Sequence, residues 1–170
     1  MPPRIELLDR HHRRGEFDCG DAALNDFLGR LAGQQQRRGF GKTYVALSDD
    51  GTEVAGFVTV SAGQVATTAL PSHLKLPRYP VPVLRVGRLA VDVRHQGKGI
   101  GRDLLAFALH LALDFSRHVG LHAAVVDAKD EAAAAFYRRL GFEPTLDAPL
   151  CLFLPLSQLA RAVPDRVRSR

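Results

Sequence analysis

The sequence has few cysteines, methionines and tryptophans: of its 170 residues, two are cysteine, one is methionine and none is tryptophan. Cys19 and Cys151 lie far apart and form no Cys-x-x-Cys pair, which argues against a zinc or redox site. His118 and His122 are four residues apart, but Gly120 interrupts any helix that would bring them together. We therefore expect no bound metal. A disulfide between the two cysteines stays open, although such bridges are rare in the cytoplasm.

The sequence also lacks any apolar run near the ~20 residues that a helix needs to cross a bilayer. The opening residues, Met1–Glu6, contain no apolar stretch of the kind found in a signal peptide. These absences predict a cytoplasmic protein that makes no membrane contact. With 46% hydrophobic and 24% charged residues, the composition and length suit one globular domain. We predict a single domain over 1–170, in which about 161–170 is a basic, frayed tail.

Positive charge is in excess, because 23 lysines and arginines face 18 acidic residues and give a formal net charge of +5. This balance favours an anionic partner such as RNA or a nucleotide cofactor. Arginines that are simply solvated would give the same balance, so composition alone leaves both interpretations open.

Apolar periodicity divides the chain into alternating strands and helices. Asp18 and Asp21 are candidate N-caps of the first helix, and Asp130 of a later one. Segment 34–38 either prolongs the first helix or leaves it, and the four prolines in 71–82 predict an extended connection. The predicted helices are 21–32, 99–118 and 130–140, and the predicted strands are 5–8, 43–47, 54–60, 84–93, 121–127 and 149–154.

Three glycines at every second position, Gly97, Gly99 and Gly101, follow the predicted strand 84–93 and open the long helix. Glycine permits a tight turn and lets a ligand approach the backbone closely. The N–H groups and the dipole of a helix N-terminus favour an anion, and Lys98 and Arg102 add cationic side chains. The pattern therefore predicts a cradle for a pyrophosphate.

Other glycine loops differ from this one. A Walker loop ends a longer spacing with Gly-Lys-Ser/Thr, and a dinucleotide-binding loop has Gly-x-Gly-x-x-Gly after the first strand of a βαβ unit. Here the third glycine comes one residue early and several strands precede the loop. A strand-to-helix turn without a ligand is the remaining alternative, and such a turn does not require three glycines.

The motif Gln96-x-x-Gly99-x-Gly101 resembles the (Arg/Gln)-x-x-Gly-x-(Gly/Ala) signature of the GNAT superfamily of N-acetyltransferases. The later run 136–142, which reads Phe-Tyr-Arg-Arg-Leu-Gly-Phe, is similar to that family in the same chain order. The resemblance extends over nearly the whole chain. It implies an α/β (α+β) fold whose mixed, mostly antiparallel central sheet is splayed at the acyl-CoA site and flanked by helices. It also implies an enzyme, an N-acetyltransferase that uses acetyl-CoA as co-substrate.

The resemblance assigns cofactor contacts to three places. Pantetheine lies along the strand before the loop, where the backbone N–H groups of Leu89, Ala90 and Val91 polarise the thioester carbonyl. Asp130 stands near the pantetheine arm, where the family often has asparagine; helix capping is the other interpretation of its carboxylate. The pyrophosphate would be held by the loop itself: Gln96, Gly97, Lys98, Gly99, Ile100, Gly101 and Arg102.

Tyr137 corresponds to the family's general acid, whose phenol protonates the departing CoA thiolate. A half-buried tyrosine that only packs beside Phe136 is the alternative. No general base is evident on the cofactor strand, where an arginine is in reach and Asp92 can face away. A lysine amine, with a pKa of ~10.4, needs such a base, whereas an α-amino group, with a pKa of ~7.7–8.0, is already partly neutral. A site without a base therefore fits a weakly basic α-amine best.

A narrower resemblance concerns the acceptor of the acetyl group. Several short runs look like parts of the GNAT toxins of type II toxin–antitoxin pairs: 17–20, 24–28, 79–83, 87–92 and 152–155. Those toxins acetylate the α-amine of the amino acid on charged tRNA and so block translation. The resemblance implies charged tRNA as substrate, a ribbon-helix-helix antitoxin as partner and a homodimer as the assembly.

The predicted function is therefore N-acetylation of aminoacyl-tRNA. A GNAT enzyme acting on a small-molecule amine or a protein N-terminus is the alternative, and a binding module without turnover is a third interpretation. Arg38, Lys42 and Arg88 are the predicted substrate contacts, through attraction to phosphate. Other residues with the same potential are Arg13, Arg14, Arg37 and Arg85.

Overall fold

The computed structural model describes residues 2–162, so most of the predicted basic tail lies outside the described residues. Its strands are β1 (Ile5–Leu7), β2 (Lys42–Leu47), β3 (Val54–Val65), β4 (Val81–Val91), β5 (Ala123–Asp127), β6 (Glu143–Pro144) and β7 (Cys151–Pro155). Its longer helical segments are α1 (Ala22–Asp26), the π-helical η1 (Phe27–Leu31), α2 (Ala32–Arg37), α3 (Ile100–Phe115), α4 (Glu131–Arg139) and α5 (Leu156–Ala162). Three short 3₁₀ turns are η2 (Thr67–Ala69), η3 (Ser72–Leu74) and η4 (Val93–His95).

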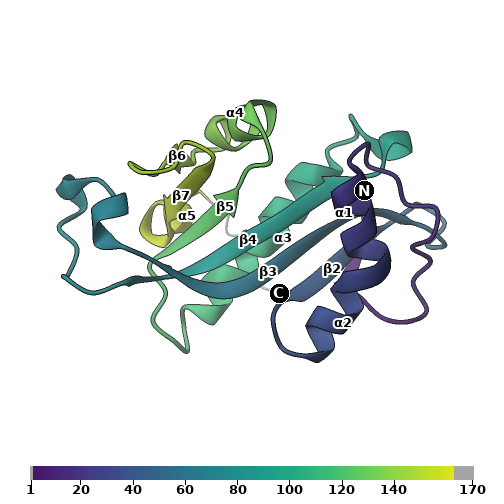
Figure 1. Cartoon of the computed structure of the whole chain (residues 1–170), viewed down its shortest axis with the longest axis horizontal. Coiled ribbons are helices and arrows are strands. Elements are labelled where there is room, and N and C mark those ends of the chain that lie inside the picture. The colour runs from purple at the N-terminus through teal and green to yellow at the C-terminus, as the bar shows by residue number, and fades with distance from the viewer. Residues whose placement is uncertain (1, 163–170) are drawn as a thin grey trace. The chain divides into compact units, whose positions relative to one another are not determined.

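The strands form a sheet in the order β1-β2-β3-β4-β5-β7-β6 (Figure 1). Pairing is antiparallel between β1 and β2, β2 and β3, β5 and β7, and β6 and β7. Only the pairing of β4 with β5, where Val83–Val86 lie opposite Ala123–Val126, is parallel among the pairings described for residues 2–162. The predicted mixed, mostly antiparallel sheet is confirmed.

The chain forms two compact units, each built from separate stretches of sequence. The first contains the described residues up to Ser61 together with Gly87–Ala108. The second contains Ala62–Val86 together with the described residues from Leu109 onward. Strands β3 and β4 and helix α3 each contribute residues to both units.

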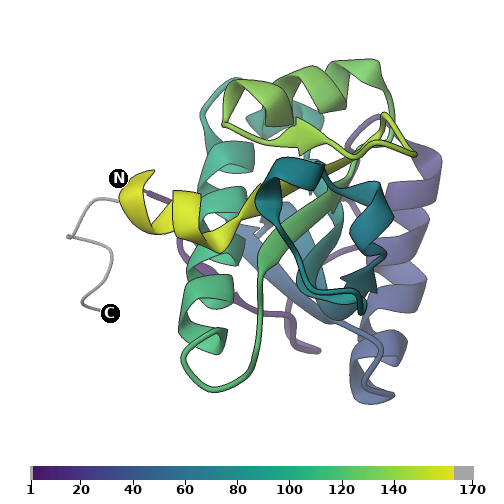
Figure 2. The same ribbon diagram turned by 90° about the vertical axis from the view of Figure 1, so that its left-hand side faces the viewer.

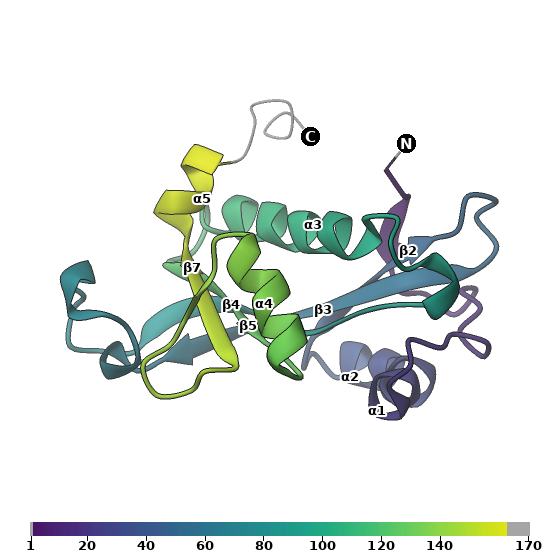
Figure 3. The ribbon, with the colours of Figure 1, turned by 90° about the horizontal axis from the view of Figure 1, so that it is seen from above.

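In the first unit, α1, η1 and α2 follow one another as a single helical segment on one side of β2 and β3 (Figure 3). Phe27, Leu28 and Ala32 of this segment are buried with Val45 of β2 and Phe57 of β3. Burying the phenylalanine, leucine and valine side chains contributes roughly 1.5–3 kcal/mol each, which holds the helical segment on the sheet.

Of the two aspartates predicted as candidate N-caps of the first helix, Asp21 is the one that caps it. The carboxylate of Asp21 accepts the N–H groups of Ala23 and Leu24, whereas Asp18 is not a cap and instead accepts Gly20 N–H and the Asn25 side-chain amide. Residues 34–37 prolong this helical segment, the first of the two possibilities that the sequence left open for 34–38. Its π-helical middle was not predicted, since a π turn has no simple sequence pattern.

The first turns of α3 cover the other face of the first unit. A Cβ added at Gly56 of β3 would lie 2.9 Å from Leu104 Cδ1 and 3.0 Å from the Ala90 carbonyl oxygen, so only glycine fits here. Tyr44 of β2 contacts Phe107 of α3, with ring centroids 4.8 Å apart. The start of α3, and with it the glycine loop, is thereby fixed against β3 and β4.

In the second unit, β5 is fully buried over Ala123–Val126, as its uninterrupted apolar run predicted. Helix α4 packs against β7, and α5, the yellow helix of Figure 2, follows β7 directly. Neither β6 nor α5 was predicted: β6 has only two residues, and α5 begins at Leu156, between the predicted strand 149–154 and the predicted tail. Residues 161 and 162, predicted to fray, belong to α5.

The described part of the chain contains no helix with the length and apolarity to cross a bilayer. Cys19 and Cys151 form no disulfide in the structure.

Candidate active site

The predicted glycine cradle lies between the end of β4 and the start of α3, as the sequence indicated. Gly97 and Gly99 have φ angles of 81° and 84°, in the left-handed region that strains other residues. A Cβ added at either glycine would have no atom within 4 Å, so the space over the loop is open. Backbone conformation, not crowding, therefore requires glycine here. The open loop in front of a helix N-terminus fits an anionic group such as a pyrophosphate.

Charged side chains around the loop suit the same ligand. Lys98 and Arg102 are both exposed, and neither has an ion-pair partner among residues 2–162. Gln96 has a role that the sequence did not indicate: its side-chain amide donates to the Val91 carbonyl oxygen at 3.0 Å and ties the loop back to the end of β4. The predicted cofactor residues Leu89–Val91 and Gln96–Arg102 thus belong to one strand–loop–helix segment of the first unit.

Asp92 directly follows β4, and its fully buried carboxylate is hydrogen-bonded within the protein. It accepts the N–H groups of Asp18 and Arg94 and the Arg94 guanidinium, with the shortest contact at 2.8 Å. Burial alone would raise the pKa of Asp92, but these hydrogen bonds lower it overall. An ionised carboxylate whose oxygens are already hydrogen-bonded inside the protein is poorly suited to act as a base for an acceptor amine. That Asp92 faces away from the acceptor stays a prediction.

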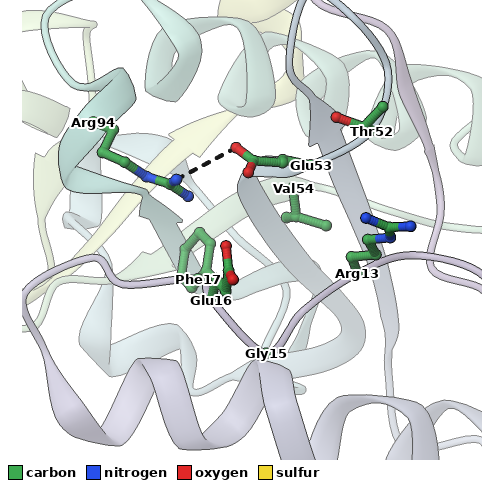
Figure 4. A pocket seen from close by; sticks show the side chains of 8 residues that line it. All are labelled: Arg13, Gly15, Glu16, Phe17, Thr52, Glu53, Val54 and Arg94. Atoms are coloured by element: carbon green, nitrogen blue, oxygen red, sulfur yellow. Dashed lines mark ion pairs between the residues drawn. The ribbon is translucent and has the colours of Figure 1, made fainter.

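Arg94 connects this buried carboxylate to a second acid. Its guanidinium lies 3.4 Å from Glu53, next to a cavity of about 300 Å³, and Figure 4 shows the two side chains pointing toward one another. The other lining residues are Arg13, Gly15, Glu16, Phe17, Thr52 and Val54. Because Arg94 lies two residues before Gln96, its contacts fix the turn η4 that leads into the glycine loop. Sequence reasoning missed this network, whose only signal was the Asp-x-Arg spacing of Asp92 and Arg94.

Arg88, a predicted substrate contact on β4, lies over the ring of Phe27, with its guanidinium carbon 3.9 Å from the ring centroid. Arg38 lies over the exposed ring of Phe40 at 5.1 Å, and Lys42 is exposed at the start of β2. Of the other basic candidates, Arg14 donates to the Leu28 carbonyl oxygen.

In the second unit, Tyr137 is buried on α4 between two aromatic neighbours. The ring centroids of Phe136 and Phe142 lie 5.4 Å and 5.9 Å from its own. Burial raises the pKa of Tyr137 to about 12, and the negative charge of Asp127 adds to the shift. The phenol is therefore fully protonated at neutral pH, which is the form that a general acid needs.

Asp127 is the acidic neighbour of Tyr137 that the sequence reasoning missed. It ends β5, and Arg85 of β4 holds both of its carboxylate oxygens, at 2.7 Å and 2.6 Å. Arg85, considered above as an RNA contact, thus already has a protein partner. An acidic residue at the end of a buried apolar run was the available signal.

Asp130 caps α4, because its carboxylate accepts the Ala133 N–H at 2.8 Å. The capping interpretation of this residue is confirmed. Its contact with pantetheine remains a prediction.

Comparison with known proteins identifies a family. Residues 35–144, more than half of the chain, match the model of the acetyltransferase (GNAT) domain. A tRNA-acetylating toxin of Mycobacterium tuberculosis (strain ATCC 25618 / H37Rv) is 35% identical over 149 residues, which cover 86% of this chain and 87% of the toxin.

Solved structures agree with this match. The AtaT protein complexed with acetyl-methionyl-tRNAfMet is 32% identical, with a TM-score of 0.87 over 94% of this chain and 98% of AtaT. A tyrosine-to-phenylalanine mutant of the AtaT toxin, bound to the C-terminus of the antitoxin AtaR and acetyl-CoA, is 29% identical. Its TM-score is 0.82, over 94% of this chain and 96% of that one. With the glycine loop and the order of its strands and helices, these matches show that the chain belongs to the GNAT acetyltransferase family.

Proposed function

We propose that this chain is an N-acetyltransferase toxin that moves the acetyl group of acetyl-CoA to the α-amine of aminoacyl-tRNA. The observation that supports acetyl-CoA as the donor is the open loop at Gly97 and Gly99, which have positive φ angles and lie just ahead of α3. The backbone N–H groups of a helix N-terminus favour an anion such as a pyrophosphate. Support for the acceptor comes from a relative that is a tRNA-acetylating toxin and from AtaT, whose solved structure is a complex with acetyl-methionyl-tRNAfMet.

The residues of this chain have defined tasks in that reaction. Gln96–Arg102 hold the pyrophosphate, and the backbone N–H groups of Leu89–Val91 stabilise the negative charge that develops on the thioester oxygen. The acceptor nitrogen forms a bond to the carbonyl carbon as the C–S bond breaks. Tyr137 gives its proton to the departing sulfur, and the proton released by the amine passes to solvent, from which the phenolate is reprotonated.

Among the described residues, the absence of an available carboxylate beside the cofactor strand favours an α-amine as the acceptor. Asp92 is occupied by Arg94, so the strand end offers no free carboxylate to deprotonate a lysine-like ammonium. An α-amine next to an ester is partly neutral near pH 7 and needs no such base. Blocking that amine would remove the charged tRNA from translation. The proposal also includes that the protein is a homodimer in the cytoplasm and that a ribbon-helix-helix antitoxin binds it.

The test is to incubate the protein with labelled acetyl-CoA and charged tRNA, with uncharged tRNA and a peptide with a free N-terminus as parallel acceptors. We expect label only in N-acetyl-aminoacyl-tRNA. Transfer to the peptide with none to any charged tRNA would instead establish the protein N-terminus as acceptor and overturn the proposal.

The role of Tyr137 is tested by Tyr137→Phe, which keeps the buried ring and removes the proton donor. We expect kcat to fall about 10²- to 10⁴-fold while acetyl-CoA affinity, measured by calorimetry, stays within twofold. Tyr79→Phe, at an exposed tyrosine, is the matched control and should keep full activity. Unchanged turnover in Tyr137→Phe would remove the acid role.

A further inference from the structure

We propose that Arg88, held by Phe27, binds a phosphate of the RNA acceptor and so selects a polynucleotide-linked amine over a small one. This inference rests on the proposed function and names a residue that recognises its acceptor. It begins from an arginine whose donors are unused: among residues 2–162, no hydrogen bond or ion pair is made by the Arg88 side chain, although it is half-buried.

Phe27 fixes this guanidinium in one orientation. The guanidinium carbon lies 3.9 Å from the centroid of the Phe27 ring, within the range of a cation–π contact. Phe27 is only 2% exposed and itself stacks on Phe57, with centroids 6.1 Å apart, so the platform under Arg88 is rigid. The ring takes up one face of the guanidinium and leaves its edge, where the five N–H donors lie, available to a planar pair of acceptors.

The π-helical turn η1 provides the platform. Phe27 is its first residue, and such turns occur as single-turn insertions that are frequent at functional sites. The turn also contacts a second arginine in another way, because the Leu28 carbonyl oxygen accepts a hydrogen bond from the Arg14 guanidinium at 3.3 Å. Two successive residues of η1 therefore position two arginines that come from distant points of the sequence.

The position of Arg88 on β4 identifies the ligand. It directly precedes Leu89–Val91, the backbone proposed to hold the thioester, so a group bound by Arg88 lies close to the reacting amine. A guanidinium edge pairs most strongly with a phosphate or carboxylate. The ester-linked amino acid of the proposed acceptor has no free carboxylate, whereas its RNA has phosphates. The chemistry therefore favours an RNA phosphate.

The experiment compares two acceptors that share the reacting group. Charged tRNA and an amino acid methyl ester both present an α-amine beside an ester, but only the tRNA has phosphates. With acetyl-CoA saturating, Arg88→Ala should raise KM for charged tRNA about tenfold and leave kcat/KM for the methyl ester within twofold. In Arg88→Ala, the plot of log tRNA affinity against log salt should become less steep by about 0.7, the value for one lost phosphate contact on a single strand.

Two further variants separate charge from orientation. Arg88→Lys keeps the charge and should preserve the salt slope while losing part of the affinity for tRNA. Phe27→Leu keeps an apolar side chain in the core and should weaken tRNA binding several-fold, with cooperative thermal unfolding showing that the fold persists. Arg30→Ala, on the same turn but paired with Asp26 at 3.1 Å, is the matched control and should change KM less than twofold.

The outcomes distinguish this inference from the function on which it rests. If the wild-type protein acetylates no charged tRNA, the proposed function fails. If it does so and Arg88→Ala has an unchanged KM for tRNA, the inference alone is overturned. An increase in KM for acetyl-CoA instead would assign Arg88 to the cofactor phosphates, and equal losses with both acceptors would assign it to the chemical step. Either result overturns the inference.

Discussion

Three aspartates of this chain have different roles, and each role depends on the groups that contact the carboxylate. Asp130 accepts a backbone N–H and begins a helix. Asp92 is buried, pairs with the exposed Arg94 and holds the turn before the glycine loop. Asp127 is held by Arg85 and raises the pKa of Tyr137. At the residue scale, chemistry therefore depends on the partner that each side chain meets, and the pair that bears most directly on catalysis is Asp127 with Tyr137.

Replacing Asp127 by asparagine should lower the pKa of Tyr137. Removing the negative charge makes the phenolate easier to form, but burial is the larger cause of the shift and remains, so the pKa should stay above its ordinary value of 10.0. With no tryptophan and only three tyrosines in the chain, phenolate absorbance reports this ionisation, once the signal of the Tyr137→Phe variant is subtracted.

The titration is recorded by stopped-flow mixing, before alkaline unfolding. Asp114→Asn removes an exposed charge that pairs with Arg117 and serves as the control with no expected effect. A midpoint for Tyr137 that does not move in Asp127→Asn would show that the carboxylate does not act on the phenol.

At the scale of elements, the proposed binding of acetyl-CoA depends on the backbone conformation of the loop between β4 and α3. Gly99 is left-handed and stands one residue before α3, whereas Gly101 lies within the helix. The family signature accepts glycine or alanine at the second position but only glycine at the first. The two positions therefore make a matched pair.

Gly99→Ala should cost about 1–2 kcal/mol of stability, because a Cβ strains a left-handed residue, and should weaken acetyl-CoA binding as the loop relaxes. Gly101→Ala should leave the loop intact and, by helix propensity, add up to about 1 kcal/mol. Chemical denaturation and calorimetry with acetyl-CoA measure both effects. Equal behaviour of the two variants would contradict a loop that depends on its left-handed glycine.

The same elements show what could be predicted from sequence and why. The glycine spacing, the buried strand β5 and the caps Asp21 and Asp130 depend on neighbours close in the chain, so local patterns predicted them. The stacking of Arg88 on Phe27 joins residues far apart in sequence. No local pattern predicts such a contact, nor the π-helical turn that presents Phe27. The Arg85–Asp127 pair was missed for the same reason.

At the scale of the whole molecule, the excess of positive charge separates the proposed acceptor from its alternative. A net charge of +5 attracts a polyanion and has little effect on a small neutral or cationic amine. Several basic side chains, including Lys42, Lys98 and Arg102, are exposed. Bound phosphates release counterions, so the affinity of an RNA acceptor should depend steeply on salt.

We therefore expect kcat/KM for charged tRNA to fall with salt while that for an amino acid methyl ester changes less than twofold. Two phosphate contacts on duplex RNA would give a log–log slope near −1.8, taking the value for duplex DNA, which is about a twelvefold loss when salt rises fourfold. Acetyl-CoA is kept saturating at every salt concentration, because it is itself an anion whose binding weakens with salt. Equal salt dependence for the two acceptors would show that the phosphates are not engaged, and a small amine would then be the better substrate class.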